Sequence, residues 1–151
     1  GVGFLWPLQN KISNPGAIVS CHWAMSIQIE HANLGQIVFV TFYGHQDTTI
    51  TMRRLEDLIV KLEAIGFCFI IAGDFNISSD DMSQWLPTHH PHMQLREGGD
   101  SCFTANSVST IDYFLFHGPV CAMQTSIQTL DTGLATHRPV NMVFDSWSNT
   151  E

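Results

Sequence analysis

The sequence has few basic residues for its length. Only 6 of its 151 residues are Lys or Arg, against 14 Asp and Glu, which gives a formal net charge of −8. A protein that grips nucleic acid through the phosphate backbone normally carries a basic face. The sequence shows no such face, which argues against a large surface for binding long duplexes.

Cysteine is also scarce, and long apolar runs are absent. The four cysteines form no CxxC pair, so neither a zinc ribbon nor a dithiol redox motif is expected. No apolar run approaches the ~20 residues of a membrane helix, and the first residues lack the pattern of a signal peptide. We therefore expect an intracellular protein, nuclear or cytoplasmic, with no membrane partner.

Apolar residues are plentiful enough for one core. Hydrophobic residues make up 44% of the chain and charged residues 13%, which excludes a disordered tail. A length of 151 residues suits a single compact domain, so we expect one domain over residues 1–151. The chain begins inside the apolar stretch GVGFLW, from which we expect that the start of the domain is missing.

The first half of the chain combines strand and helix periodicities. Residues 17–30 alternate between apolar and polar and predict a half-buried strand. Residues 36–43 predict the next strand, which would pair with the first as an antiparallel hairpin. Apolar residues at helical spacing in 51–65 predict a helix that ends at Gly66. Residues 67–72 then predict a buried strand.

The second half is richer in strands. Two serines at 78–79, followed by acidic residues, predict a helix start. The segment THHPHM (88–93) predicts a solvated loop, with a metal site at its three histidines as the less favoured alternative. The elements together predict an α/β sandwich of the α+β class. Further strands with antiparallel pairing are predicted at 101–104, 110–116, around 120–130 and 138–144.

The sequence GDFN (73–76) places two polar side chains directly after a buried strand. If the backbone stays extended, Asp74 and Asn76 point to the same side and Phe75 points into the core. A carboxylate here can orient or deprotonate a water, and a carboxamide can donate to a phosphate oxygen or coordinate a cation. An Asp/Asn turn, in which these side chains cap their own backbone, accounts for the pattern equally well.

Three more residues have side chains that suit a phosphate site. Asp112 begins an apolar strand, where a carboxylate needs a partner such as histidine. His137 precedes the last strand, and an imidazole held by a carboxylate can act as an acid or stabilise the charge of a phosphorane. Tyr43 ends a strand and can hydrogen-bond a phosphate. Taken singly, each has a simpler interpretation: a solvent-facing aspartate, a loop histidine and a tyrosine at the sheet rim.

In this order, the segments resemble the endonuclease/exonuclease/phosphatase family, which has the DNase I-like fold. GDFN is similar to the family's G-D-[FL]-N, TIDYFLF (110–116) to its [IL]-D-Y strand, and THRPV (136–140) to its terminal S-D-H-x-P-[VIL]. VTFYGHQ (41–47) resembles the strand that ends in Y-x-P. GVGFLW (1–6) resembles the G-G-V-[AG] strand of retrotransposon members, so the closest type is the retrotransposon or apurinic endonuclease.

The resemblance implies a four-layered α/β sandwich and metal-dependent hydrolysis of a phosphate ester, usually in nucleic acid, with Mg²⁺ or Mn²⁺. By this resemblance Asp74 would orient or activate the attacking water, and Asn76 would hold the scissile phosphate. Asp112 would fix the tautomer of His137, and His137 would stabilise the charge of the transition state or protonate the leaving group. Tyr43 would contact the phosphate.

Two departures from the family pattern affect the metal site. Thr136 stands where the family has an aspartate that binds metal, and threonine is a poorer ligand for a hard cation. The family also begins with strands that carry an asparagine or aspartate and the metal-binding glutamate, ahead of the segment resembled by residues 1–6. The chain therefore corresponds to the C-terminal two-thirds of the domain, truncated at its N-terminus, and no metal ligand can be assigned.

The leading hypothesis is a metal-dependent phosphodiesterase, a DNA endonuclease, impaired here by the missing part of the metal site. One alternative is a non-catalytic remnant that keeps the fold and binds a phosphate. Another is a phosphatase acting on a small phosphorylated molecule, which would suit the shortage of basic residues. The expected partner is accordingly DNA or a small phosphate ester.

Overall fold

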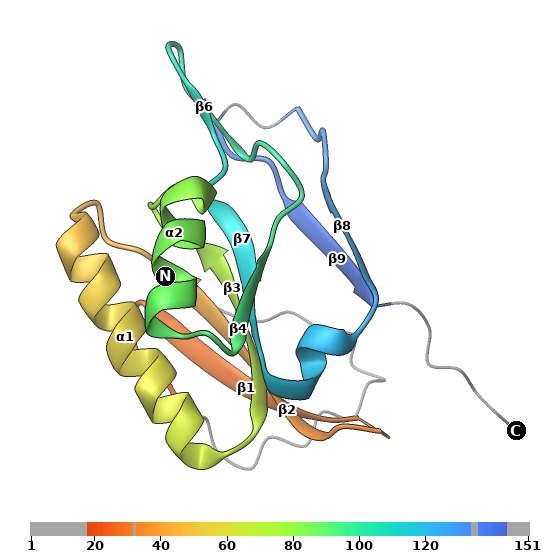
Figure 1. Cartoon of the computed structure of the whole chain (residues 1–151). Coiled ribbons are helices and arrows are strands. Elements are labelled where there is room, and N and C mark those ends of the chain that lie inside the picture. Colours follow the sequence, from red (N-terminus) through yellow and green to blue (C-terminus); the bar gives the residue numbers. More distant parts are fainter. Residues whose placement is uncertain (1–17, 32, 134–135, 145–151) are drawn as a thin grey trace, which may run out of the picture.

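The computed structural model describes residues 18–31, 33–133 and 136–144 (Figure 1). The strand expected from the resemblance over residues 1–6 lies outside the described residues. None of the helices in the described part of the chain has the length and apolar character needed to cross a membrane.

A five-stranded mixed sheet forms the middle of the molecule, with the strand order β1-β2-β3-β7-β4. β2 and β3 are parallel, and the other neighbours are antiparallel. The predicted hairpin of the first two strands is confirmed, whereas the short strand β4 was not predicted. The strands span Ala24–His31 (β1), Gly35–Tyr43 (β2), Cys68–Asp74 (β3), Met93–Arg96 (β4) and Asp112–His117 (β7).

Two helices cover one face of this sheet (Figure 1). α1 (Thr48–Ile65) begins after Asp47, whose carboxylate accepts N–H groups of the first turn. It ends at Gly66, which has φ 80° and caps the helix in the left-handed conformation, as predicted. α2 (Ser79–His89) begins after Ser78, whose hydroxyl caps its first turn.

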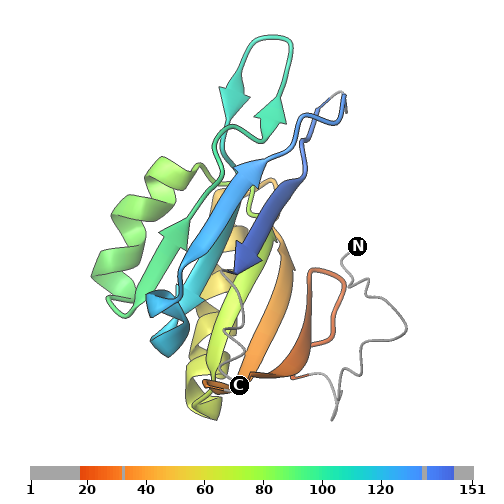
Figure 2. The ribbon, with the colours of Figure 1, turned by 90° about the vertical axis from the view of Figure 1, so that its right-hand side faces the viewer.

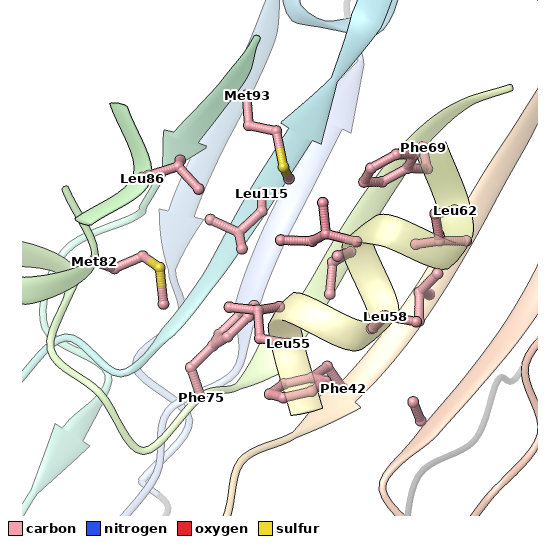
Figure 3. Close-up of a cluster of buried hydrophobic side chains, with 14 of the residues drawn as sticks. Phe42, Leu55, Leu58, Leu62, Phe69, Phe75, Met82, Leu86, Met93 and Leu115 are labelled. Carbon is pink, nitrogen blue, oxygen red and sulfur yellow. The ribbon is translucent and has the colours of Figure 1, made fainter. Parts of the chain in front are cut away.

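The main core lies between these helices and the large sheet (Figure 3). Alternate residues of each strand face the helices, because successive side chains of a strand point to opposite sides. Burying each large apolar side chain contributes roughly 1.5–3 kcal/mol to stability. The core therefore holds the two helices against the large sheet. The labelled side chains of this core are Phe42, Leu55, Leu58, Leu62, Phe69, Phe75, Met82, Leu86, Met93 and Leu115.

A small antiparallel sheet covers part of the opposite face (Figure 2). It consists of β8 (Thr125–Thr129) and β9 (Val140–Phe144). Phe144 packs against Phe39 and Phe116 of the large sheet, with ring centroids 6.2 and 6.5 Å away. The described residues therefore form three layers: the helices, the large sheet and the small sheet.

Two short elements change the strands predicted for the second half. β5 (Cys102–Phe103) and β6 (Val108–Ser109) form an antiparallel hairpin that projects from the edge of the sandwich (Figure 1). The 3-10 helix η1 (Gly118–Ala122) takes up the first part of the strand predicted around 120–130. That strand is consequently confined to β8.

The three clustered histidines do not share one environment. His89 is the last residue of α2, and both His89 and His92 are exposed. His90 is only 6% exposed, with Nε2 2.9 Å from Glu56 Oε2 and Nδ1 3.6 Å from Glu63 Oε1. The prediction of a solvated loop over 88–93 is wrong for residues 88–89, which end α2, and for Met93, which begins β4. It is also wrong for His90, because α1 brings two carboxylates over the end of α2.

Candidate active site

Polar residues occupy one end of three neighbouring strands in the large sheet. The parallel strands β2 and β3 both end there, and the antiparallel strand β7 begins there. In the ladder, Tyr43 pairs with Asp74, and Asp74 pairs with Asp112. Residues that are directly opposite in a ladder point to the same face. The three residues therefore form a row across β2, β3 and β7.

Strand alternation places this row on the side of the small sheet. Ile70 lies four residues before Asp74 and Phe116 four residues after Asp112, and both pack in the cluster beneath β8 and β9. Phe75 is out of phase with Asp74 and points into the helix-side core, where it is fully buried as predicted. The polar row thus lies at the rim between the two sheets.

His137 reaches the row from the segment that precedes β9. Its Nδ1 lies 3.2 Å from Asp112 Oδ2, and the two side chains are 44% and 21% exposed, respectively. The fully buried Ser101 holds the strand that carries the aspartate, since its Oγ accepts the N–H of Asp112 at 3.1 Å. The structure therefore brings together the two residues that the sequence suggested as a pair.

Asp74 takes part in both a turn and a charge cluster. Its Oδ1 accepts the N–H of Asn76 at 3.0 Å, which is the turn that the sequence left open. Burial raises the pKa of Asp74, and the Asp112 carboxylate raises it further. The Asn76 N–H and the His137 ring oppose this rise. A carboxylate with a raised pKa is a better proton acceptor, so the turn does not exclude the predicted chemical role of Asp74.

Asn76 does not continue the extended strand. It has φ 52°, in the left-handed region, and β3 ends two residues earlier. The expectation that it points alongside Asp74 from extended backbone is therefore wrong. Its Nδ2 donates to the Gly44 carbonyl at 3.0 Å, and the carboxamide has a second N–H to offer. A Cβ on Gly44 would lie 2.0 Å from the Phe75 carbonyl oxygen, so only glycine permits this approach.

Tyr43 lies at the outer end of the row. Its side chain is 47% exposed, and its backbone N–H donates to the Trp23 carbonyl at 2.8 Å. This exposure agrees with a tyrosine at the sheet rim. Contact between its hydroxyl and a phosphate remains a prediction.

Two residues of the row, together with His137, offer ligand atoms for a cation. One such atom from each of Asp74, Asp112 and His137 lies within 4.8 Å of the others, a grouping found once among the described residues. The last two are engaged with each other, which leaves Asp74 as the available carboxylate. Mg²⁺ needs only one or two carboxylates when waters and phosphate oxygens complete its shell. The donors present therefore fit a divalent cation held chiefly by Asp74, to which the exposed Thr136 adds no carboxylate.

Sequence reasoning missed three residues that shape this rim: Gly44, Ser101 and Cys102. Gly44 directly follows a strand, which is a recognisable sign of close backbone approach. Ser101 and Cys102 gave no local sign, because their partners are distant in the sequence. The Cys102 Sγ lies 3.8 Å from Nε2 of His137, 35 residues away.

No protein-family model matches the sequence, and a search of the curated proteins gives no match. Solved structures do match. The chain aligns with the endonuclease domain of TRAS1, a telomere-specific non-LTR retrotransposon, at 13% identity and a TM-score of 0.60, covering 83% of this chain and 64% of that one. An endonuclease/exonuclease/phosphatase family protein from Bacteroides thetaiotaomicron aligns at 17% identity and a TM-score of 0.53, covering 78% and 53%. A mannosyl-6-phosphatase from the same species aligns at 14% identity and a TM-score of 0.54, covering 80% and 56%.

These likenesses concern the fold. The chain has the DNase I-like fold that its motifs led us to expect, in a mixed α+β arrangement. It spans 53–64% of the length of the three structures. The roles of the individual site residues stay predictions.

Proposed function

We propose that the rim site binds a phosphate ester and, with a divalent cation, hydrolyses it as a phosphodiesterase of the DNA endonuclease type. The rim site consists of Tyr43, Asp74, Asn76, Asp112 and His137. The observation that carries this proposal is the meeting of Asp74, Asp112 and His137, which come from three separate segments to within 4.8 Å. Phosphoryl transfer needs positioning and charge neutralisation more than covalent chemistry. A rim of carboxylates and an imidazole meets both needs.

Each residue of the row, together with His137 and Asn76, has a role in this proposal. Asp74 orients the attacking water or accepts its proton. Asp112 accepts the Nδ1–H of His137 and so fixes the tautomer and orientation of the ring. His137 then stabilises the charge that develops on the phosphate or protonates the leaving oxygen. Asn76 and Tyr43 hold the phosphate oxygens from the two neighbouring strand ends.

The cation would be Mg²⁺ or Mn²⁺, and Asp74 is the residue that would hold it. When bound, the cation neutralises charge on the phosphate. Because Thr136 stands where the resembled family has an aspartate, we propose that this chain binds the cation weakly and turns over slowly.

A phosphatase acting on a small phosphorylated molecule is the second candidate, and the charge of the chain favours it. The chain has 6 basic and 14 acidic residues. Arg138 lies over the Phe103 ring, 4.0 Å from its centroid, and 3.7 Å from Asp131. Arg96 donates to two backbone carbonyls. These two cations are already engaged by neighbouring residues, and of the other described basic residues only Arg53 and Lys61 are exposed. That is a small basic surface for a long duplex. A mannosyl-6-phosphatase shares the fold.

Ligand binding tests the proposal without requiring turnover. Backbone amide spectra of the ¹⁵N-labelled chain are recorded with a thymidine dinucleotide or with mannose 6-phosphate, each with and without Mg²⁺. We expect shifts at Asp74, Asp112 and His137 that require Mg²⁺ and that are lost in Asp74→Ala. The matched control is Asp57→Ala, which removes an exposed carboxylate on α1. Shifts with the dinucleotide alone favour the phosphodiesterase, and shifts with mannose 6-phosphate alone favour the phosphatase.

Plasmid nicking tests the chemistry directly. We expect nicking by the unmodified chain to be slow or below detection, and Thr136→Asp to raise it in a manner that EDTA abolishes. Ser83→Asp, which adds the same charge to the exposed face of α2, should change nothing. If neither ligand perturbs the rim, or if nicking survives EDTA and Asp74→Ala, the proposed function is wrong. Binding without nicking by any variant would instead support a non-catalytic remnant.

A further inference from the structure

Cys102 is locked beside the imidazole of His137 by the backbone on both sides of it. The two residues form an isolated antiparallel bridge. The N–H of Phe103 donates to the Thr136 carbonyl at 2.7 Å, and the N–H of Arg138 donates to the Ser101 carbonyl at 2.8 Å. The paired backbone therefore holds the two residues opposite each other, and Cys102 Sγ lies 3.8 Å from His137 Nε2.

The other ring nitrogen decides what this contact can do. His137 Nδ1 lies 3.2 Å from Asp112 Oδ2, so the carboxylate holds the proton on Nδ1. In the neutral ring Nε2 is then the acceptor, and it faces the thiol of Cys102. The three groups match the arrangement of an activated nucleophile. The thiol is the nucleophile, the imidazole is the base that takes its proton, and the carboxylate orients the imidazole.

We propose that Cys102 is the reactive thiol of this chain, and that its modification by an electrophile prevents a phosphate ester from binding at the rim site. In the modification by a haloacetamide, the S–C bond forms as the C–I bond breaks. The sulfur supplies the electron pair, iodide leaves, and the thiol proton passes to His137 Nε2 and then to solvent. The adduct occupies the space next to Nε2, which is the ring nitrogen that Asp112 does not engage and that would meet a phosphate. This second part rests on the proposed function, whereas the reactivity of the thiol does not.

The other three cysteines serve as internal references. Cys68 is buried, and burial raises the pKa of its thiol. Burial likewise raises the pKa of the Cys121 thiol, which donates to the Phe116 carbonyl at 3.4 Å. Cys21 has intermediate exposure, like Cys102, and packs against the main core. Cys21 is therefore the matched comparison, and protection of Cys68 reports that the chain is folded.

Competitive alkylation tests the first part. The folded chain is treated at neutral pH with iodoacetamide below stoichiometry, and the four cysteines are quantified by peptide mass spectrometry. We expect Cys102 to react about tenfold faster than Cys21. His137→Gln should lower its rate to that of Cys21, Asp112→Asn should give a rate between the two, and His89→Gln should change nothing. Equal rates for Cys102 and Cys21, or a rate unchanged by His137→Gln while Cys68 stays protected, would overturn the proposal.

Phosphate binding tests the second part on the same samples. The alkylated chain should lose the Mg²⁺-dependent shifts caused by the dinucleotide at His137. Cys102→Ser should bind the dinucleotide and keep doing so after treatment with iodoacetamide. Unchanged binding by a fully alkylated chain refutes the second part. A fast-reacting Cys102 in a chain that binds no phosphate ester refutes the proposed function and the second part, and leaves the reactive thiol standing.

Discussion

Phe75 joins the loop after β3 to the core, so shortening its side chain should cost far more stability than a substitution at the surface. It is fully buried. Its ring stacks on Tyr113 with centroids 4.2 Å apart and planes 3° from parallel, and on Phe42 with centroids 5.2 Å apart. Phe75→Ala removes both stacks and leaves a cavity, for which losses of roughly 3–5 kcal/mol are typical. Since a domain is stable by only about 5–15 kcal/mol, the variant should lose from about a fifth to all of its stability.

Urea unfolding followed by circular dichroism measures this loss. In thermal unfolding of a domain of this size each kcal/mol shifts Tm by roughly 2–4 °C, so Phe75→Ala should melt roughly 6–20 °C below the parent. The control is Phe67→Ala, directly before β3. Phe67 is 37% exposed, so this substitution should cost under about 1 kcal/mol of stability. If the two variants lose equal stability, Phe75 does not anchor the loop and the account of the rim is wrong.

Two further predictions concern charge and burial. Because the pKa of Asp74 is raised, the folded chain binds a proton more tightly than the unfolded chain, so stability falls as pH rises from the ordinary aspartate pKa through the raised one. Asp74→Asn should therefore stabilise the fold at neutral pH by about 1 kcal/mol, with a gain that shrinks on acidification; a urea midpoint that is unchanged at pH 7 contradicts this. His90→Ala should cost about 2 kcal/mol through the lost contacts with Glu56 and Glu63, whereas His92→Ala, at an exposed position, should stay within about 0.5 kcal/mol; equal urea midpoints for the two would refute the distinction.

Local patterns carried most of the fold. Alternation located β1, helical spacing located α1, and runs of apolar residues located β2 and β3. The left-handed cap at Gly66 follows from a residue type that adopts positive φ at little cost. The strand β4 escaped prediction because four residues are too few to show a period, and its pairing is supplied by β7.

The rim site was only partly readable for a similar reason. Asp112 and His137 drew attention because a carboxylate at the start of an apolar strand needs a partner. The environments of His90 and Cys102 depend on partners 34 and 35 residues away in the sequence. The left-handed backbone at Asn76 depends on the approach of Gly44 from the neighbouring strand end. Such long-range contacts leave no periodic trace in one sequence.

The charges of the rim argue for an order in which ligands bind. Asp74 and Asp112 are direct neighbours in the ladder, and burial together with the Asp112 carboxylate raises the pKa of Asp74. One imidazole cannot compensate two carboxylates and a phosphate as well. A phosphate ester arriving alone would therefore be repelled at the distances that separate these groups. A divalent cation held by Asp74 offsets the charge of the two carboxylates, so cation and phosphate should bind with positive coupling. The proposed Mg²⁺ requirement for phosphate binding is thus a consequence of the arrangement of Asp74, Asp112 and His137, and it holds whether the phosphate belongs to DNA or to a small molecule.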